Sequence, residues 1–195
     1  KINFEVHLYQ SGYLTIREKK QVEDTVFYSL KIPNLEVKSS LNKVVVSSLT
    51  DSDSRLISST LHRNMLLALS NADMEGIKDT LHTLFASLPY QNYANNNISL
   101  YEGFYASVVY AFLASLGVPL IGEDTTNRGR IDLTLNMEQK VYIIEFKMGG
   151  GNALEQIKAK KYYEKYWNMH KDIYLVGINF DEEERNLSGF TFQHF

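Results

Sequence analysis

The second half of the chain has the hydrophobic pattern of a helix followed by strands. Residues 101–116 carry apolar side chains at helical spacing, and Gly117 with Pro119 just beyond it ends the predicted helix. The elements predicted after it are strands at 118–123, 130–136 and 141–147, a helix at 153–167 and a strand at 173–180. A chain that ends with a strand, a helix and a second strand implies a right-handed crossover, which makes the two strands parallel neighbours. The order α-β-β-β-α-β therefore predicts an α/β fold with a mixed sheet flanked by helices.

The first half of the chain predicts a hairpin followed by a helix. Strand-forming residues at 13–16 and 26–30 flank the charged stretch 17–24, which we interpret as the hairpin loop. The sequence Ile32-Pro33-Asn34 then starts a helix that runs toward Leu49.

Two more helices are predicted before the middle of the chain. Apolar residues recur at helical spacing over about residues 55–69 and 72–88, which we interpret as a helical layer that covers a core. The polar segment 89–97, with three consecutive asparagines, is the best candidate for a domain boundary.

Two charged residues stand out in the strand predicted at residues 141–147. Because side chains alternate between the faces of a strand, Glu145 and Lys147 lie with Val141 and Ile143 on one face. Charged groups on an otherwise apolar face are costly to bury unless they are partnered or bind a metal. The strand therefore indicates a metal site, with a structural ion pair as the alternative.

Asp132 is expected to join this site from the neighbouring strand. It alternates with apolar residues over 130–136, so it is predicted to lie on the opposite face from them. These apolar residues are Ile131, Leu133 and Leu135. Pairing through the polar turn 136–140 would set Asp132 near Glu145 across the ladder. Two adjacent carboxylates repel each other, and a hard divalent cation with oxygen ligands relieves the repulsion.

The Glu-x-Lys spacing is weak evidence when taken without its context. It occurs four times, at Glu18/Lys20, Glu36/Lys38, Glu138/Lys140 and Glu145/Lys147. Only the fourth pair lies in an apolar strand that follows a strand with an isolated aspartate. The other three lie in charged loops or at a polar helix start, which is typical of solvated surface.

Composition narrows the class of protein. The 195 residues include no cysteine and five histidines, which excludes thiolate metal sites and argues against structural zinc. The formal net charge of -3 gives no overall attraction to nucleic acid, although a bound cation reverses the field locally. No apolar run could span a bilayer and no signal peptide is visible, so we expect a cytoplasmic protein. The abrupt start suggests a fragment of something longer.

Several motifs resemble the PD-(D/E)XK nuclease superfamily. They are Tyr101-Glu102-Gly103-Phe104-Tyr105, Gly129-Arg130-Ile131-Asp132, Ile144-Glu145-Phe146-Lys147, Leu154-Glu155-Gln156-Ile157 and Tyr162-Tyr163. They look most like a bacterial group that joins an N-terminal AAA-ATPase-like domain to a C-terminal nuclease-superfamily domain. The stretch 9–16 and Ile32-Pro33-Asn34 look like the very end of that ATPase-like region.

The resemblance implies a restriction-endonuclease-like fold and a division of the chain into three parts. Residues 1–50 would be the end of the ATPase-like domain (a hairpin plus a helix), residues 51–89 a helical connector, and residues 90–195 the nuclease-like domain. No GxxxxGK[ST] loop is present, so any ATPase core would lie in a region missing from this sequence. Ile131 stands where the eponymous proline would precede Asp132, at a position that varies in the superfamily.

The resemblance also implies roles for the site residues. Asp132 and Glu145 would hold Mg²⁺ or Mn²⁺, with the backbone carbonyl of Phe146 assisting. Lys147 would orient the attacking water or help to deprotonate it, and would stabilise charge on the phosphate oxygens.

Glu102 and the second helix of the motif region each have two interpretations. Glu102 would add a third carboxylate to the metal site, or it would form a capping box with Ser99. Gln156 and Lys160 lie one helical turn apart and would hold water or phosphate near the site, as in resolvase-type members. The alternative for both is an ordinary solvated helix face.

The remaining candidates are cationic and aromatic. Arg128 and Arg130 flank Gly129 and would grip a phosphate, or they form a charged turn. Gly149–Gly151 lacks the Lys-Ser/Thr of a phosphate loop and is interpreted as flexible backbone. Four aromatic residues could stack on bases, with burial against the sheet expected for at least half of them. They are Tyr162, Tyr163, Tyr166 and Trp167.

Together these features predict Mg²⁺- or Mn²⁺-dependent hydrolysis of phosphodiester bonds in nucleic acid, with DNA as the expected substrate. The alternative is a nuclease-fold module that binds protein or DNA without catalysis, which the acidic balance and the lack of an obvious basic groove favour. A winged-helix-like DNA reader over residues 8–49 is a third hypothesis, disfavoured because acidic residues offset its basic ones.

Overall fold

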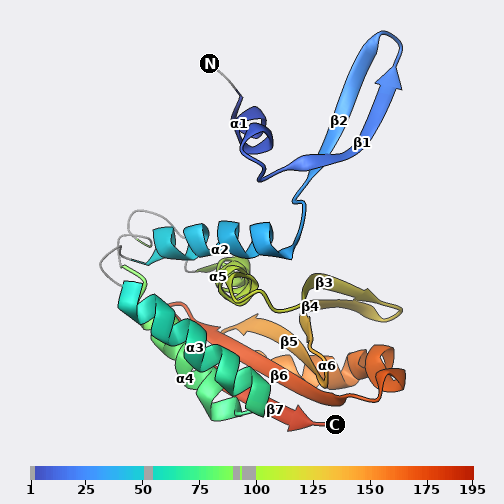
Figure 1. Ribbon diagram of the computed structural model, residues 1–195. Coiled ribbons are helices and arrows are strands. Elements are labelled where there is room, and N and C mark those ends of the chain that lie inside the picture. The colour runs from blue at the N-terminus through green and yellow to red at the C-terminus, as the bar shows by residue number, and fades with distance from the viewer. Residues whose placement is uncertain (1–2, 51–54, 90–92, 94–99) are drawn as a thin grey trace.

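A five-stranded mixed sheet forms the centre of the molecule (Figure 1). The computed structural model describes residues 3–50, 55–89, 93 and 100–195. In spatial order the strands are β3 (Leu120–Thr126), β4 (Gly129–Asn136), β5 (Lys140–Met148), β6 (Asp172–Asp181) and β7 (Asn186–His194). The pair β5–β6 is parallel and the other pairs are antiparallel. The predicted α-β-β-β-α-β order and mixed sheet are confirmed.

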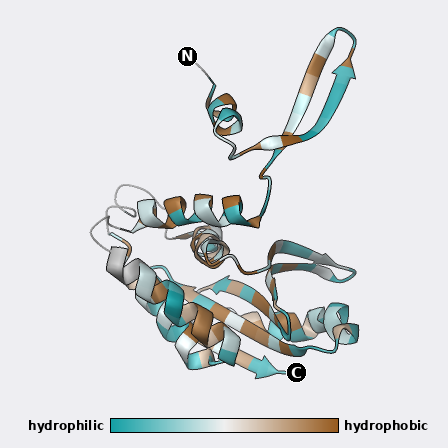
Figure 2. Cartoon of the chain, viewed as in Figure 1, coloured by the Kyte–Doolittle hydropathy of each residue, from teal (hydrophilic) through white to brown (hydrophobic). Residues whose placement is uncertain are grey.

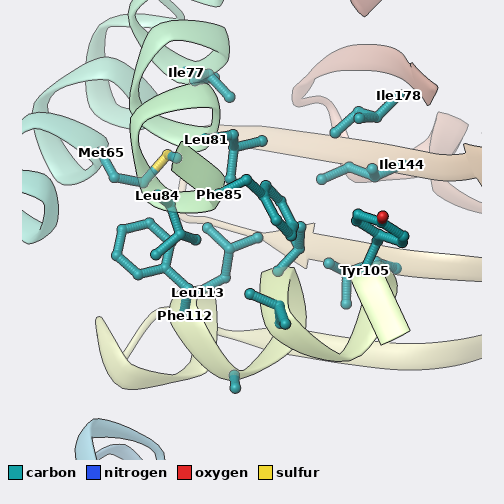
Figure 3. Packing of buried hydrophobic residues seen from close by; sticks show 14 of the residues in the cluster. Met65, Ile77, Leu81, Leu84, Phe85, Tyr105, Phe112, Leu113, Ile144 and Ile178 are labelled. Carbon is teal, nitrogen blue, oxygen red and sulfur yellow. The ribbon is translucent and has the colours of Figure 1, made fainter. Parts of the chain in front are cut away.

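Helices cover both faces of the sheet and enclose two separate apolar cores. On one face α3 (Arg55–Asn71), α4 (Met74–Ala86) and α5 (Glu102–Ser115) pack against β4, β5 and β6. Figure 3 shows this packing, with Met65 of α3, Leu81 of α4 and Ile144 of β5 in one cluster. On the other face α6 (Ala153–Lys160) and the 3-10 helix η4 (Tyr162–Met169) cover a smaller core that includes Ile143 and Ile157.

Strand β5 also holds the end of α3 through polar contacts. The hydroxyl of Tyr142 donates to the carbonyl of Leu69 at 2.6 Å, and the ammonium of Lys140 donates to the carbonyl of Ser70 at 2.7 Å. The last carbonyls of a helix lack partners within the helix, so these side chains satisfy them. Helix α3 is therefore joined to the sheet both by apolar packing and by hydrogen bonds.

The N-terminal part of the chain forms an arm and a helix. The arm consists of α1 (Phe4–Gln10) and the hairpin of β1 (Thr15–Val22) and β2 (Thr25–Lys31), which stands away from the sheet in Figure 1. Helix α2 (Leu35–Leu49) begins after Asn34, whose side chain accepts the N–H of Val37 at 2.9 Å, and it packs on α5.

Three local predictions differ from the structure. The charged stretch 17–22 lies within β1 and not in a loop, because both faces of this hairpin are exposed and burial does not select apolar residues there. The helix predicted at 153–167 ends at Lys160, since Lys161 adopts the left-handed conformation (φ 50°) and η4 follows. Strand β7 was not predicted, because its apolar alternation is weak and it follows an acidic turn.

No helix in the described part of the chain is both long enough and apolar enough to cross a membrane.

We expect Met65→Ala to lower the free energy of unfolding by about 2–5 kcal/mol, because it opens a cavity in the larger core. Met65 is fully buried in α3, within the same cluster as Ile144 of β5. Leu67→Ala on the same helix is the matched control, since Leu67 is 52% exposed and its removal should cost less than about 0.5 kcal/mol. Urea denaturation followed by circular dichroism measures both, and equal losses would contradict the shared core.

Candidate functional site

The site is built around a carboxyl group on the central strand. Along β5, Val141 and Ile143 face the smaller core under α6 and η4, and Glu145 follows them on the same face. The side chain of Glu145 is fully buried, with 0% of its surface exposed. A buried carboxyl group on an apolar face requires specific partners, and the neighbouring elements supply them.

Asp132 lies opposite Glu145, at the point where β4 separates from β5. The last aligned pair between the two strands is Leu133 with Ile144. One position further on, the carboxylate of Asp132 accepts the backbone N–H of Phe146 at 2.9 Å. A side chain thus takes the hydrogen bond that a strand carbonyl would otherwise accept. The structure brings Asp132 and Glu145 together, as the hairpin register led us to expect.

The faces of β4 do not alternate regularly through Asp132. Leu133 and Leu135 belong to the larger core, whereas Ile131 lies in the smaller one. The prediction that these three residues share a face is therefore wrong for Ile131. The physical reason is local distortion, since β4 leaves β5 beyond Leu133 and Glu123, opposite Asp132 on β3, has a left-handed backbone (φ 53°).

Gln156 of α6 contacts the buried carboxyl group directly. Its amide Nε2 donates to Oε2 of Glu145 at 2.8 Å. Helix α6 begins over the sheet after Asn152, whose side chain accepts the N–H of Glu155 at 3.1 Å. Gly177 of β6 is the parallel neighbour of Glu145, and a Cβ atom there would lie 2.5 Å from the backbone nitrogen of Leu154. The absence of a side chain at Gly177 therefore lets α6 approach closely enough for Gln156 to reach Glu145.

The glycine loop between β5 and α6 is fixed by β6. The amide of Asn179 donates to the carbonyl of Gly149 at 3.0 Å and also to the carbonyl of Gly151. A Cβ atom on Gly151 would lie 3.2 Å from the side-chain carbons of Lys147. The loop thus packs along the aliphatic part of Lys147, and the side chain of Asn179 holds two of its carbonyls.

Lys147 and Glu102 form an ion pair at the end of the sheet. The ammonium of Lys147 lies 3.7 Å from the carboxylate of Glu102, and both side chains are partly exposed. Glu102 is the first residue of α5, and its N-cap Tyr101 makes no side-chain capping bond. A capping box would require Glu102 at the third helical position, so the helix start does not fit it. Ser99, the other member of that expected box, lies outside the described residues.

The electrostatics of the site favour a protonated Glu145 when no cation is present. Burial raises the pKa of Glu145 to about 9, and the negative charge of Asp132 adds to this shift. The positive charge of Lys147 acts in the opposite direction but is the smaller influence. A hydrogen bond between the protonated carboxyl group of Glu145 and Asp132 also raises this pKa. As a carboxylate oxygen, the buried Oε1 of Glu145 accepts no hydrogen bond from the described part of the chain.

These donors fit a small divalent cation. Asp132 and Glu145 offer carboxylate oxygens, and the unpartnered Oε1 is the kind of atom that a cation would satisfy. Mg²⁺ is held in proteins through one or two carboxylates together with water. Among the described residues no group of three His, Cys, Asp or Glu side chains lies close enough to share a metal. Glu102 therefore does not complete a three-carboxylate set here.

The other predicted site residues lie around this centre. Arg128 pairs with Glu164 of η4 at 3.5 Å, and Arg130 pairs with Glu123 of β3 at 3.3 Å. Lys160 is exposed at the end of α6. The two arginines are thus engaged in surface ion pairs beside the site, and the structure does not bring them to the carboxylates.

Sequence reasoning missed the supporting contacts. Tyr162 donates from its hydroxyl to the carbonyl of Arg130 at 3.1 Å, two residues before Asp132. Its ring is buried, and burial followed by the negative charge of Glu145 raises the pKa of Tyr162. Gly177 was detectable in principle, because a glycine within an apolar strand often marks close approach of another backbone.

The comparisons with known proteins agree with this geometry. The family model described as the PD-(D/E)XK nuclease superfamily matches residues 100–189. The chain is 38% identical over 194 residues to a protein from Azotobacter chroococcum mcd 1 with the name "Uncharacterized protein in vnfD 5'region". That match covers 97% of this chain and 37% of the length of the relative. No solved structure matches. The family match and the mixed sheet together confirm the restriction-endonuclease-like fold.

We expect Gly177→Ala to lower the free energy of unfolding by about 1–3 kcal/mol, because the new methyl group would displace the start of α6. Gly103→Ala is the matched control, since a Cβ there meets nothing within 4 Å and the helical position favours alanine by up to about 1 kcal/mol. Urea midpoints of both variants test the prediction. If Gly177→Ala is as stable as the wild type, α6 does not depend on this close approach.

We expect Glu145→Gln to stabilise the metal-free protein at neutral pH by on the order of 1–3 kcal/mol. The folded pKa of about 9 lies above the ordinary value of 4.5, so the folded state holds a proton that the unfolded state releases. The wild type should therefore lose stability as the pH rises from 4.5 to 9, whereas the variant should not. Melting temperatures of the wild type and the variant, measured in chelator across this pH range, test the prediction. If the difference between the two proteins does not change with pH, the prediction is wrong.

Proposed function

We propose that this chain hydrolyses phosphodiester bonds in nucleic acid, with DNA as its substrate, at a site formed by Asp132, Glu145 and Lys147. The observation that carries the proposal is the buried Oε1 of Glu145, which has no hydrogen-bond partner in the described part of the chain and lies beside a second carboxylate. Such a pair stays ionised at neutral pH only when a cation compensates both charges. The match of residues 100–189 to a nuclease superfamily supports the same assignment.

Asp132 and Glu145 would hold the cation, Mg²⁺ or Mn²⁺, with the carbonyl of Phe146 as a further oxygen donor. A bound divalent ion neutralises charge on the phosphate and lowers the pKa of a coordinated water. Asp132 is oriented for this role by the N–H of Phe146. Gln156 donates a hydrogen bond to Oε2 of Glu145, so Oε1 would be the oxygen available to the ion.

Lys147 would supply the positive charge of the site. Its aliphatic stem packs against Gly151, and its positive charge acts on Glu145. There it would orient the attacking water and stabilise negative charge on the phosphate oxygens. Glu102 would position this ammonium group through their 3.7 Å ion pair and would not bind the metal directly.

Arg128, Arg130 and Lys160 would contact flanking phosphates of the substrate. All three side chains lie toward the solvent around the site. The ion pairs of the two arginines involve exposed or half-exposed groups, so a phosphate can replace the glutamate partner at small cost.

The arm of α1, β1 and β2 would dock on a further part of the protein. We expect residues 1–50 to complete an ATPase-like region, with residues 51–89 as a connector to the nuclease-like residues 90–195. The support is exposure: Phe4 is 70% exposed and Phe27 is 56% exposed on an arm that Figure 2 shows to carry hydrophobic residues. A two-stranded hairpin is marginally stable in water without packing partners.

We expect Lys147→Ala to reduce cleavage of plasmid DNA by at least about 100-fold while leaving Mn²⁺ binding intact, because a protonated lysine cannot coordinate metal. Asp132→Ala should lose both cleavage and Mn²⁺ binding. Cleavage is assayed with Mg²⁺, with Mn²⁺ and with chelator, and Mn²⁺ binding by calorimetry.

Lys78→Ala is the matched control, since Lys78 is an exposed lysine of α4 in an ion pair with Glu75 and should leave both readouts unchanged. If the wild type cleaves neither plasmid nor single-stranded DNA, and neither metal changes its melting temperature, hydrolysis is refuted. A nuclease-fold binding module without catalysis would then take its place.

A further inference from the structure

Three aromatic side chains pack on one another beside the smaller core, and two of them are exposed. Tyr163 of η4 stacks on Phe195 with ring centroids 4.1 Å apart, and Trp167 meets both rings edge-on at 6.1 and 6.0 Å. Trp167 is 58% exposed and Phe195 is 44% exposed. We call Tyr163, Trp167 and Phe195 the aromatic platform.

Packing of η4 accounts for Tyr163, which is partly buried against the smaller core, but not for Trp167. The 3-10 helix is anchored by two other aromatic residues, Tyr162 and Tyr166, which are almost fully buried in the smaller core. Tyr166 also donates its hydroxyl to the buried carboxylate of Asp124 on β3. Trp167 therefore extends into solvent from a helix that is already attached to the sheet, and its ring leaves a large aromatic face uncovered.

The aromatic platform and the candidate site lie on the same face of the sheet. The backbone N–H of Phe195 donates to the carbonyl of Ile173 on β6, while Glu145 is paired with Gly177. Ile173 and Gly177 are four residues apart on β6, which corresponds to about 13 Å along the strand. At the near end of η4, Tyr162 contacts the carbonyl of Arg130, two residues from Asp132.

The same segment carries more lysines than acidic residues. Residues 153–171 contain five lysines and two glutamates, a formal surplus of three positive charges in a chain whose net charge is -3. An open pocket of about 440 Å³ lies between η4 and the tip of the β3–β4 hairpin. Its lining offers donors suited to phosphate oxygens from Lys161, Thr125, Thr126 and Asn127. It also includes Glu164, which pairs with Lys161, and Lys165, which pairs with Asp124.

We infer that η4 binds an unpaired nucleic-acid strand, with bases stacked on the aromatic platform and the phosphate backbone held by Lys158, Lys160 and Lys161. This inference rests on the proposed function and specifies its substrate as DNA with single-stranded character. A ring can stack only on a base whose face is free, and in a duplex neighbouring bases cover those faces. Aromatic side chains combined with cations are the features by which proteins hold single strands.

The charge of this surface decides between a nucleic acid and other occupants. Lys160 is exposed, and Lys158 and Lys161 lie in surface ion pairs with Glu155 and Glu164. A phosphate backbone can replace these glutamates at small cost, whereas an apolar protein surface offers the lysines no partner in exchange. The platform is also small, with three rings, which fits one or two stacked bases.

Binding is tested in chelator, so that no cleavage is needed. Trp167 is the single tryptophan of the chain, and its fluorescence reports contact with bases. We expect a single-stranded thymidine oligonucleotide to quench this fluorescence, and a blunt duplex or an abasic oligonucleotide of equal charge to leave it unchanged. Trp167→Ala should weaken binding of the labelled single strand, measured by anisotropy, by roughly 5- to 100-fold. Trp167→Phe keeps a stacking ring and should retain most of the affinity.

Phe27→Ala is the matched control, because Phe27 is an equally exposed aromatic residue (56%) on the distant arm and should change the affinity less than two-fold. Unchanged fluorescence at saturation, or equal affinities of Trp167→Ala and the wild type, would overturn the inference. If sedimentation shows that Trp167→Ala changes only the oligomeric state, the inference is also overturned, and self-association takes its place. Binding without cleavage in Mg²⁺ would refute hydrolysis alone, and cleavage without quenching would refute this inference alone.

Discussion

A carboxyl group withdrawn from water, with a second carboxylate beside it, is the constraint on which the site depends. Glu145 is unfavourable where it lies unless its oxygens are satisfied, and each neighbouring element serves that need. Gly177 lets α6 approach the sheet, and the helix then directs Gln156 to Oε2. The second oxygen accepts no hydrogen bond among the described residues.

One face of the sheet mainly supplies apolar packing, and the other face carries the candidate site. The face toward α3, α4 and α5 encloses the larger core, and it also ties down the end of α3 through Tyr142. The face toward α6 and η4 has the smaller core, and polar groups interrupt it at Glu145 and at Asp124. Asp124 is satisfied by Thr134, Lys165 and Tyr166, so it is a structural counterpart to the incompletely satisfied Glu145.

The sequence predicted those features that follow from local periodicity. The alternation of apolar and charged residues along β5, and the short turn before it, were enough to expect Glu145 near Asp132. Features that depend on tertiary contacts could not be predicted from the sequence. The charged strand β1 has no buried face to pattern it, Lys161 ends α6 through a backbone conformation that no local motif indicated, and Ile131 changes face because β4 leaves β5. The roles of the site residues remain predictions.

The topology also orders the assembly of the site in time. Strands β3, β4 and β5 are consecutive and antiparallel, so their contacts close short loops, whereas the parallel pairing of β5 with β6 requires the whole segment 149–171 to cross over. Short loops close at lower entropic cost and form first. Asp132 and Glu145 should therefore meet while α6 is still undocked and both are hydrated. If the pair binds a divalent cation as proposed, cations present during refolding would reach it at that stage, before the crossover docks.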